Sequence, residues 1–344
     1  MSSQDCVLPF YQLRGEPEEI GHQHGTLLKD RIHECYEFYT KTLFDKPNFD
    51  FKKHGLRFLE IITNYHEPYG REIKALAEAA EMEPWQIAVL NARSEIFLVA
   101  KTELTGECTA LFFEEAGLLG QNWDWMTPCE RFMVLLEIEN TQGQKILTMT
   151  EAGILGKVGF NDAGLGVCLN ILLGDQPYAA APIHIMLRRV MECRTLEEVQ
   201  QEMDRADAYG YSNMLIAQAD GAYMNLEFMG KTYARVAYDQ IPVHTNHFLN
   251  APIDQQDIPP IVNSKTRLNR AKSLIAELNQ PDLDDMIRVL LDKENGPDAI
   301  CKAYAPMWDT EHGTICSLVM DLKTKTLHIT KGSPYHQEFV SHAL

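Results

Sequence analysis

Several features that would place a chain in a specialised class are missing from these 344 residues. There is no C-x-x-C pair, so a structural zinc site has no support from the sequence. No apolar run approaches the roughly 18 residues that a membrane-spanning helix requires. We also find no internal repeat and no low-complexity segment. These absences predict a globular chain that forms one large domain or two ordinary ones.

Basic residues are scarce as well. The chain has 31 Lys and Arg against 49 Asp and Glu, which gives a formal net charge of -18 and a pI of about 5.1. Nucleic acids and anionic membranes are bound by basic surfaces, so we expect neither as a main partner.

The cysteines are scattered, and no apolar stretch follows Met1. We therefore expect no secretory signal, reduced thiols and a cytoplasmic location. The eight positions are Cys6, Cys35, Cys108, Cys129, Cys168, Cys193, Cys301 and Cys316.

Helical patterns dominate the first hundred residues. After a short strand at 9–15, Pro17 and the acidic residues that follow it begin a helix. Residues 26–100 continue as helix, because apolar residues recur at spacings of three and four. His22 and His24 stand two apart and would point in different directions on a helix, so they are not a metal pair. Gly21 and Gly25 are expected to permit close packing of helices.

From about residue 102 the pattern changes to strands. A turn at Asn140–Gly143 and another at Asp220–Gly221 indicate hairpins, and the central strands are expected to form a meander. Thr195 with Glu198 has the spacing of a capping box. Two sheets covered by helices are the natural layered solution. Strands are predicted at 132–138, 145–150, 153–155, 157–161, 166–172, 213–220, 222–228, 234–238, 243–247, 314–321 and 326–331, helices at 182–208, 264–276 and 283–291, and a loop at 251–260.

The stretch around Cys108 is predicted to be a hairpin of two short apolar strands, with a tight turn at 115–117. Cys108 stands at the start of the first strand. Asn122 and Asp124 lie two apart in the second strand, so they share a face. The simplest interpretation is a buried cysteine in a hairpin, because free cysteine is among the most buried residue types.

A cysteine becomes a nucleophile only when a base takes its proton. One candidate base is His244 or His247, as in a papain-like enzyme. Another is the α-amino group of Cys108 itself, once the preceding peptide bond is cut, because an α-amine has a pKa near 7.7–8.0. Asn122 and Asn246 could donate hydrogen bonds to an oxyanion. Asp124 could orient the α-ammonium group.

The residues around Cys108 resemble the isopenicillin-N acyltransferase (acyl-CoA:6-aminopenicillanate acyltransferase) family of self-cleaving N-terminal-nucleophile enzymes. The likeness rests first on Glu107–Cys108–Thr109 followed by Gly120–Trp125, which is fairly specific. It extends over most of residues 9–335. The weaker matching segments are Arg14–Gly15, Ile20–Gly25, Leu90–Glu95, Gly159–Asn161 with Gly164–Leu165, His244–His247 and Ala299–Cys301.

The resemblance implies an α+β fold, a four-layer αββα sandwich of two mainly antiparallel sheets. It also implies cleavage between Glu107 and Cys108, giving a helical chain 1–107 that stays associated with a catalytic chain 108–344 in one domain. The family's nucleophile falls on Cys108, its strand aspartate on Asp124 and its oxyanion asparagine on Asn246. A basic residue that the family places late in the chain falls on Lys302.

The implied chemistry is attack of the Cys108 sulfur on an amide or thioester carbonyl of a small N-acyl or acyl-CoA substrate. No cofactor is implied, although a coenzyme A thioester can serve as acyl donor. The family includes both acyltransferases and amide hydrolases.

Two departures keep alternatives open. Glu107 replaces the glycine of the penicillin-forming enzymes, and Lys302 replaces an arginine, which is a planar fork rather than a point charge. One alternative is therefore an uncleaved, non-enzymatic relative that binds a small acyl ligand or a partner. The other is an uncleaved papain-like hydrolase that uses His244 or His247.

Overall fold

The computed structural model describes residues 8–44, 48–100, 107–174, 181–206, 210–238, 240–250, 263–307 and 309–344, and it contains two β-sheets. The eight-stranded sheet has the order β1 (Phe10–Gly15), β4 (Met133–Asn140), β5 (Lys145–Glu151), β6 (Val158–Asn161), β7 (Leu165–Ile171), β8 (Tyr211–Gln218), β9 (Tyr223–Met229) and β10 (Thr232–Arg235). The seven-stranded sheet has the order β11 (Val243–His244), β2 (Glu107–Phe113), β3 (Leu118–Met126), β13 (Thr310–Asp321), β14 (Thr326–Ile329) and β15 (Val340–Ala343), with β12 (Ala305–Met307) paired to β13.

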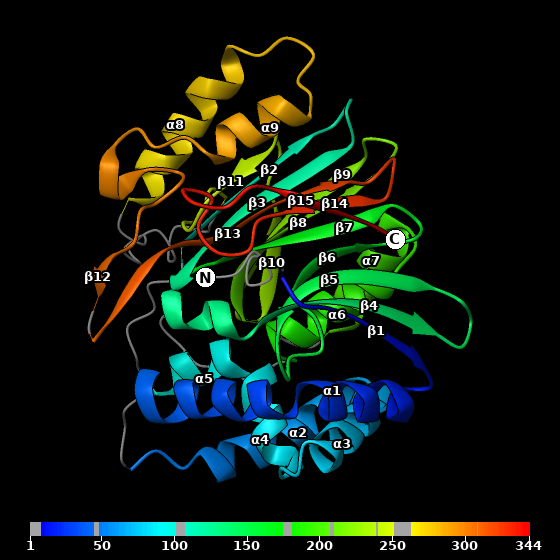
Figure 1. Ribbon diagram of the computed structural model, residues 1–344. Helices are drawn as coiled ribbons and strands as arrows, with labels where there is room; N and C mark the ends of the chain where they lie inside the picture. The colour runs from blue at the N-terminus through cyan, green and yellow to red at the C-terminus, as the bar shows by residue number, and fades with distance from the viewer. Residues whose placement is uncertain are drawn as a thin grey trace.

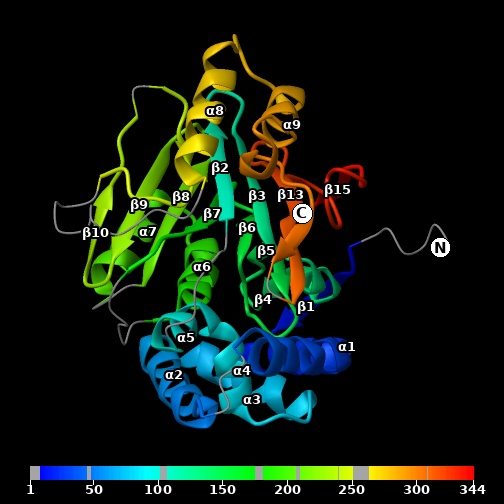
Figure 2. The ribbon, with the colours of Figure 1, turned by 90° about the vertical axis from the view of Figure 1, so that its left-hand side faces the viewer.

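Helices lie outside both sheets, as Figures 1 and 2 show. The helices near the start of the chain are α1 (Pro17–Glu37) with a π-helical continuation at Phe38–Leu43, α2 (Phe51–Tyr65), α3 (Glu67–Ala79), α4 (Pro84–Asn91) and α5 (Arg93–Ala100). The later ones are α6 (Ile183–Glu192), α7 (Leu196–Arg205), α8 (Ser264–Ala276) and α9 (Leu283–Leu290), with short 3-10 turns at Thr127–Arg131 and Gly296–Asp298. No helix of the described ranges is both long and apolar enough to cross a bilayer.

The layers follow the predicted αββα order. β2 and β3 contact β7, and β2 also contacts β8, so the two sheets are stacked. α6 and α7 pack on the eight-stranded sheet, and α8 and α9 pack on the seven-stranded one (Figure 2). The helices α1 to α5 form a further cluster that contacts β1 through α1 and α6 through α4. The fold is therefore the α+β sandwich expected from the family resemblance.

Most predicted elements are confirmed. The strands from β4 to β10 are sequential neighbours, as the predicted meander requires, and only β1 joins this sheet in parallel. The Thr195 hydroxyl accepts a hydrogen bond from the Glu198 amide at 3.2 Å, which confirms that Thr195 caps α7. The predicted loop at 251–260 lies outside the described residues.

Three predictions of strands were wrong. Residues 153–155 form a turn instead of a strand, because Gly153 has a positive φ of 89° and the chain folds back from Glu151 to Ile154. The strand predicted at 243–247 ends after His244, since Thr245 and Asn246 turn their polar groups toward α8. The hairpin of β13 and β14 is not the last, because β15 pairs with β14.

The two glycines of α1 do permit close packing of helices. A Cβ atom on Gly21 would lie 2.2 Å from the Glu72 carbonyl oxygen of α3, and one on Gly25 would lie 2.3 Å from the Leu76 carbonyl oxygen. The backbone of α1 therefore touches the backbone of α3 along this seam, and any larger residue would force the helices apart.

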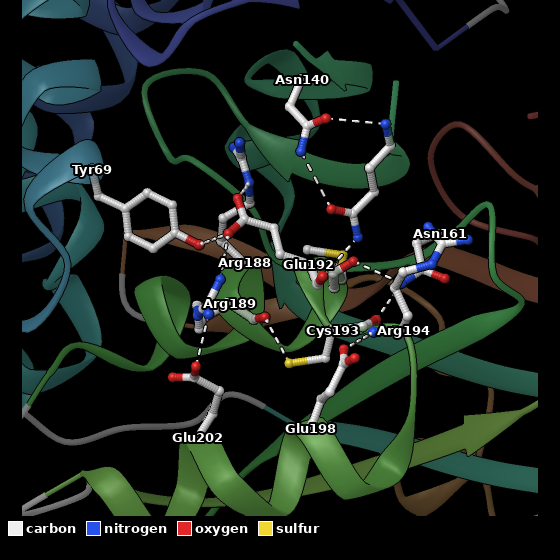
Figure 3. A network of polar contacts seen from close by, with 12 residues as sticks. Tyr69, Asn140, Asn161, Arg188, Arg189, Glu192, Cys193, Arg194, Glu198 and Glu202 are labelled. Atoms are coloured by element: carbon white, nitrogen blue, oxygen red, sulfur yellow. Dashed lines mark hydrogen bonds and ion pairs between the residues drawn. The ribbon is translucent and has the colours of Figure 1, made fainter. Parts of the chain in front are cut away.

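The helices before residue 107 are bound to the rest of the chain by buried polar contacts as well as by apolar packing. The Tyr69 hydroxyl of α3 donates to the Glu192 carboxylate of α6 at 2.7 Å (Figure 3). Arg188 of α6 pairs with Glu192 and, at 3.3 Å, with Glu72 of α3. One apolar cluster also includes residues from both sides of the Glu107–Cys108 bond. The helices before residue 107 are therefore packed directly against the rest of the chain.

The seam between α1 and α3 generates a stability prediction. Gly25→Ala should lower the free energy of unfolding by about 1–3 kcal/mol, because the added methyl group meets a backbone carbonyl that cannot move alone. Alanine is otherwise the better helix residue by about 1 kcal/mol, so the loss would report the contact. Thr26→Ala, on the exposed side of the same turn, is the control and should cost nothing. Urea unfolding of both variants tests this, and equal stabilities would contradict it.

Candidate active site

The β2–β3 hairpin places Cys108 on the inner face of its sheet. Cys108 lies directly opposite Trp123, and Glu107 lies opposite Asp124. Paired residues share a face, so Cys108 and Trp123 point between the sheets while Asp124 points toward the α8 side. The apolar residues sort in the same way. Ala110 and Phe112 belong to the main core, whereas Leu111 and Phe113 pack with α8 and α9.

The Cys108 side chain lines a small pocket, and Cys108 is only 5% exposed. Three alternate residues of β3, Gln121, Trp123 and Trp125, face the same pocket, and residues of β7, α5 and α6 close its other sides. The remaining lining residues are Arg93, Ser94, Lys157, Leu169, Ile171 and His184. Cys108 therefore stands at the wall of a small, mostly enclosed pocket.

The backbone of Cys108 is held on both sides. Its N–H donates to Asn246 Oδ1 at 2.7 Å, and its carbonyl oxygen accepts a hydrogen bond from the Arg267 guanidinium group. Arg267 also donates to Asn246 Oδ1 at 2.8 Å and to the Thr109 hydroxyl at 3.0 Å. The structure thus brings Asn246 to the nitrogen of Cys108. The amide Nδ2 of Asn246, expected as an oxyanion donor, here donates to the Ile171 carbonyl at 2.9 Å.

Asp124 is completely buried beside this cluster. Its Oδ1 accepts from the Thr314 hydroxyl at 2.6 Å, whereas its Oδ2 has no hydrogen-bond partner among the described residues. Burial raises the pKa of Asp124 to about 7, against the opposing charge of Arg267. The Thr314 hydroxyl also accepts from the Lys302 amide at 2.8 Å. The backbone of Lys302 is therefore one hydrogen bond removed from Asp124, and burial lowers the pKa of the Lys302 ammonium group to about 7.

The side chain of Asn122, which we predicted as an oxyanion donor, makes other hydrogen bonds. Its Nδ2 donates to the carbonyls of Leu290 and Ile300, at 2.7 and 3.0 Å, and its Oδ1 accepts from Ser317. These contacts attach α9 and the segment after it to the outer face of β3. Asn122 shares the face of Asp124, as predicted, but it is absent from the lining of the Cys108 pocket.

The Cys108 thiol is strongly protonated in this environment. Burial, together with the negative charge of Asp124, raises the pKa of Cys108 to about 12, although Lys157 and Arg267 act in the opposite direction. A thiolate must therefore be generated by a neighbouring base during any reaction.

The two candidate histidines are occupied elsewhere. His244 contacts Glu227 at 2.8 Å through Nε2 and the Thr245 carbonyl at 2.7 Å through Nδ1. His247 contacts the Ser264 hydroxyl at 2.7 Å. Neither histidine lines the pocket of Cys108. This geometry gives no support to a papain-like pair.

The sequence reasoning missed two cations of this site, Arg267 and Lys157. Arg267 is fully buried on α8, and a signal for it existed, because it stands four and eight residues before the buried Ala271 and Ile275. A charged residue in an apolar stripe requires a buried partner. For Lys157, directly before β6, we find no comparable signal in the pattern of its neighbours.

Asp124 generates a prediction for stability against pH. Its pKa is near 7 in the folded chain and about 3.8 when exposed, so the folded state binds more protons between these values. This contribution lowers stability as pH rises from 4 to 7, by about 4 kcal/mol in total. In a Cys108→Ala chain, Asp124→Asn should remove that decline while keeping an acceptor for Thr314. Urea unfolding between pH 4 and 8 measures the free energy of unfolding of the Cys108→Ala chain with and without Asp124→Asn. Parallel curves of this free energy against pH would contradict the prediction.

A family model and a curated relative both match this chain. The model described as acyl-coenzyme A:6-aminopenicillanic acid acyl-transferase matches residues 113–336, a range that begins just after Cys108 and includes Asp124, Asn246 and Lys302. The acyl-coenzyme A:6-aminopenicillanic-acid-acyltransferase 40 kDa form of Emericella nidulans is 30% identical over 335 residues, covering 93% of this chain and 92% of the relative.

Solved structures with a similar arrangement come from other organisms. An N-acylethanolamine-hydrolyzing acid amidase ortholog of Caenorhabditis elegans has a TM-score of 0.43 and 14% identity, over 63% of this chain and 93% of that one. Penicillin V acylase from Agrobacterium tumefaciens has a TM-score of 0.47 and 13% identity, over 69% and 86%. It is the family model and the curated relative that show that this chain belongs to the acyl-coenzyme A:6-aminopenicillanic acid acyl-transferase family.

Proposed function

We propose that the chain cuts itself between Glu107 and Cys108, and that the processed protein is a cysteine amidohydrolase or acyltransferase. Cys108 is the nucleophile, and its freed α-amino group is the base that serves each turnover. The observation that carries this proposal is the position of Cys108. Its thiol lines the pocket, while its backbone N–H donates a hydrogen bond to Asn246 Oδ1 at 2.7 Å. A nitrogen held in this way is already positioned to remain beside the sulfur as an α-amine.

The reaction begins when the α-amine takes the thiol proton, for which its ordinary pKa of about 7.7–8.0 is suitable. The sulfur attacks the carbonyl carbon of an amide or thioester, and the leaving amine or thiol departs with a proton. A thioester acyl-enzyme remains, and water or an amine then attacks its carbonyl carbon and accepts the acyl group, which restores the thiol. We assign Asn246 Nδ2, beside the pocket at the Ile171 carbonyl, as donor to the oxyanion. Asp124 and Lys302 support the site from the outer face of the sheet.

The pocket supports a small acyl group as the part of the substrate that enters. Its walls combine the rings of Trp123 and Trp125 with the aliphatic side chains of Leu169 and Ile171, a lining that suits an apolar acyl group. The leaving group, an amine or coenzyme A, would then remain outside the enclosed part.

The second partner in this proposal is the chain's own segment 1–107. The contacts of Tyr69 and Glu72 with α6, and the shared apolar cluster, are unaffected by a cut before Cys108. We therefore propose a processed heterodimer of chains 1–107 and 108–344, acting in the cytoplasm.

Self-cleavage predicts two fragments from purified protein. Dividing 39.2 kDa in proportion to 107 and 237 residues gives bands of about 12 and 27 kDa, which should elute together from a sizing column. Sequencing of the larger band should begin Cys-Thr-Ala-Leu. Cys108→Ala should stay intact, whereas Cys168→Ala, at a second buried cysteine of the same core, should be cut normally.

The opposite result is equally clear. A single intact chain that still turns over N-acyl substrates would contradict the proposal. It would favour an enzyme whose thiol acts without cleavage of the chain. An intact chain that also resists a thiol-reactive acyl probe at Cys108 would favour an uncleaved ligand-binding protein. A screen of N-acyl amino acids, N-acyl amines and acyl-CoA thioesters would then identify the substrate of a processed chain.

A further inference from the structure

The proposed mechanism leaves the first cut without a base. Before cleavage the nitrogen of Cys108 belongs to a peptide bond and donates its N–H to Asn246, so it cannot accept a proton. The thiol is nevertheless buried and protonated, with a pKa raised to about 12. Another group at the pocket must therefore take this proton if the chain cuts itself.

Three basic side chains line the pocket with Cys108, and they are not equivalent. Arg93 cannot give up its proton under ordinary conditions, so it cannot serve as a base. His184 is completely buried, and burial lowers its pKa well below the ordinary value, so its imidazole is a weak base here. Lys157 and Cys108, in contrast, affect each other directly. The charge of Lys157 lowers the pKa of the thiol, and the charge of the thiolate raises the pKa of Lys157.

The position of Lys157 is fixed by its neighbours. Its Nζ lies 2.8 Å from the centroid of the Trp123 ring, and Trp123 is the residue directly opposite Cys108 in the hairpin. Side chains of directly opposed residues have Cβ atoms about 5 Å apart. The ammonium group therefore stands on the aromatic wall that adjoins the sulfur.

Glu151 holds Lys157 from the other side, at 3.2 Å, and is itself shared. It also pairs with Arg93 at 2.6 Å and accepts a hydrogen bond from Tyr39. One carboxylate is thus divided between two cations and a hydroxyl, so it compensates the charge of Lys157 only in part. Burial lowers the pKa of Lys157 to about 7, which leaves a substantial fraction of neutral amine at neutral pH. The charged or titratable groups that act on Lys157 or are acted on by it are Arg93, Cys108, Glu151, His184, Cys35, Cys129 and Cys316.

From this geometry we infer that Lys157 is the proton acceptor for self-cleavage, a role that rests on the proposed function. The neutral amine takes the thiol proton, and the sulfur attacks the carbonyl carbon of Glu107. The bond from that carbon to the Cys108 nitrogen breaks, and the Lys157 ammonium returns the proton to the departing nitrogen. Water then hydrolyses the thioester, which releases the Glu107 carboxylate and restores the thiol. From then on the new α-amine lies closer to the sulfur and replaces Lys157 as base.

The sharpest test is Lys157→Arg in the full chain. Arginine keeps the positive charge and can still pair with Glu151, but it cannot accept a proton. We expect cleavage to slow by at least about 100-fold, the usual contribution of a general base. The rate is measured on the chain made by cell-free synthesis, by following loss of the intact band after translation is stopped. Lys145→Arg, a surface lysine paired with Glu137 in the same sheet, is the matched control and should be cut at the rate of the unchanged chain.

A second variant separates proton transfer from support of the fold. Lys157→Ala should be cut slowly, and added ethylamine should restore cleavage in proportion to its concentration of free base. In the unchanged chain the cleavage rate should rise with pH through about 7 and then level off, as neutral Lys157 accumulates.

The outcomes are distinguishable from those of the proposed function. If the unchanged chain is never cut, self-cleavage itself is wrong. If the unchanged chain is cut and Lys157→Arg is cut within about threefold of its rate, the role of Lys157 is overturned while self-cleavage stands. The role would be established by a Lys157→Arg chain that melts at the temperature of the Lys145→Arg control, is cut at least about 100-fold more slowly than the unchanged chain and shows no rise in rate near pH 7.

Discussion

The hold of Arg267 on the start of β2 is the interaction on which the site depends. One fully buried guanidinium group joins α8 to the Cys108 carbonyl, the Thr109 hydroxyl and Asn246 Oδ1. A buried charge is tolerable only when its donors are satisfied and an opposite charge is near, and Asp124 supplies that charge. Because these partners of Arg267 come from β2 and from the segment after β11, they cannot shift independently. The nitrogen and the carbonyl of Cys108 therefore have fixed positions before any bond is cut.

The β2–β3 hairpin divides the chemistry between its two faces. The inner face carries the Cys108 thiol and the rings of Trp123 and Trp125, which other elements face with Arg93 and Lys157, whereas the outer face carries Asp124 and Asn122 under α8 and α9. Each face needs its own cover, since a sheet that is buried on both sides must be packed by two layers. The four-layer architecture thus follows from the need to bury both sides of the strand that carries Cys108. The segment before Glu107 contributes Arg93 to the pocket, so the site is complete only when both parts of the chain are packed together.

Much of the local structure could be predicted, because it depends on neighbours in the sequence. The hairpin turn, the cap at Thr195 and the helical run before residue 100 all arise from short-range hydrogen bonding or periodicity. The failures concern contacts over longer separations. Nothing near residue 340 predicts that it pairs with β14, and the turn at Gly153 follows from a backbone conformation that the apolar pattern of 153–155 conceals.

The sequence by itself determined which residues could do chemistry: the cysteine at the start of an apolar strand, the aspartate and asparagine on one face of the next, and the family to which the motifs point. Tertiary structure alone decided what these residues meet. Asn246 was expected to donate to an oxyanion and is found at the nitrogen of Cys108, while Asn122 anchors α9 away from the pocket. Arg267 and Lys157, which stand 159 and 49 positions after Cys108, were not predicted as residues of the site. The physical reason is that the charge and proton affinity of a buried group depend on what is packed around it, and those neighbours are brought together only by the fold.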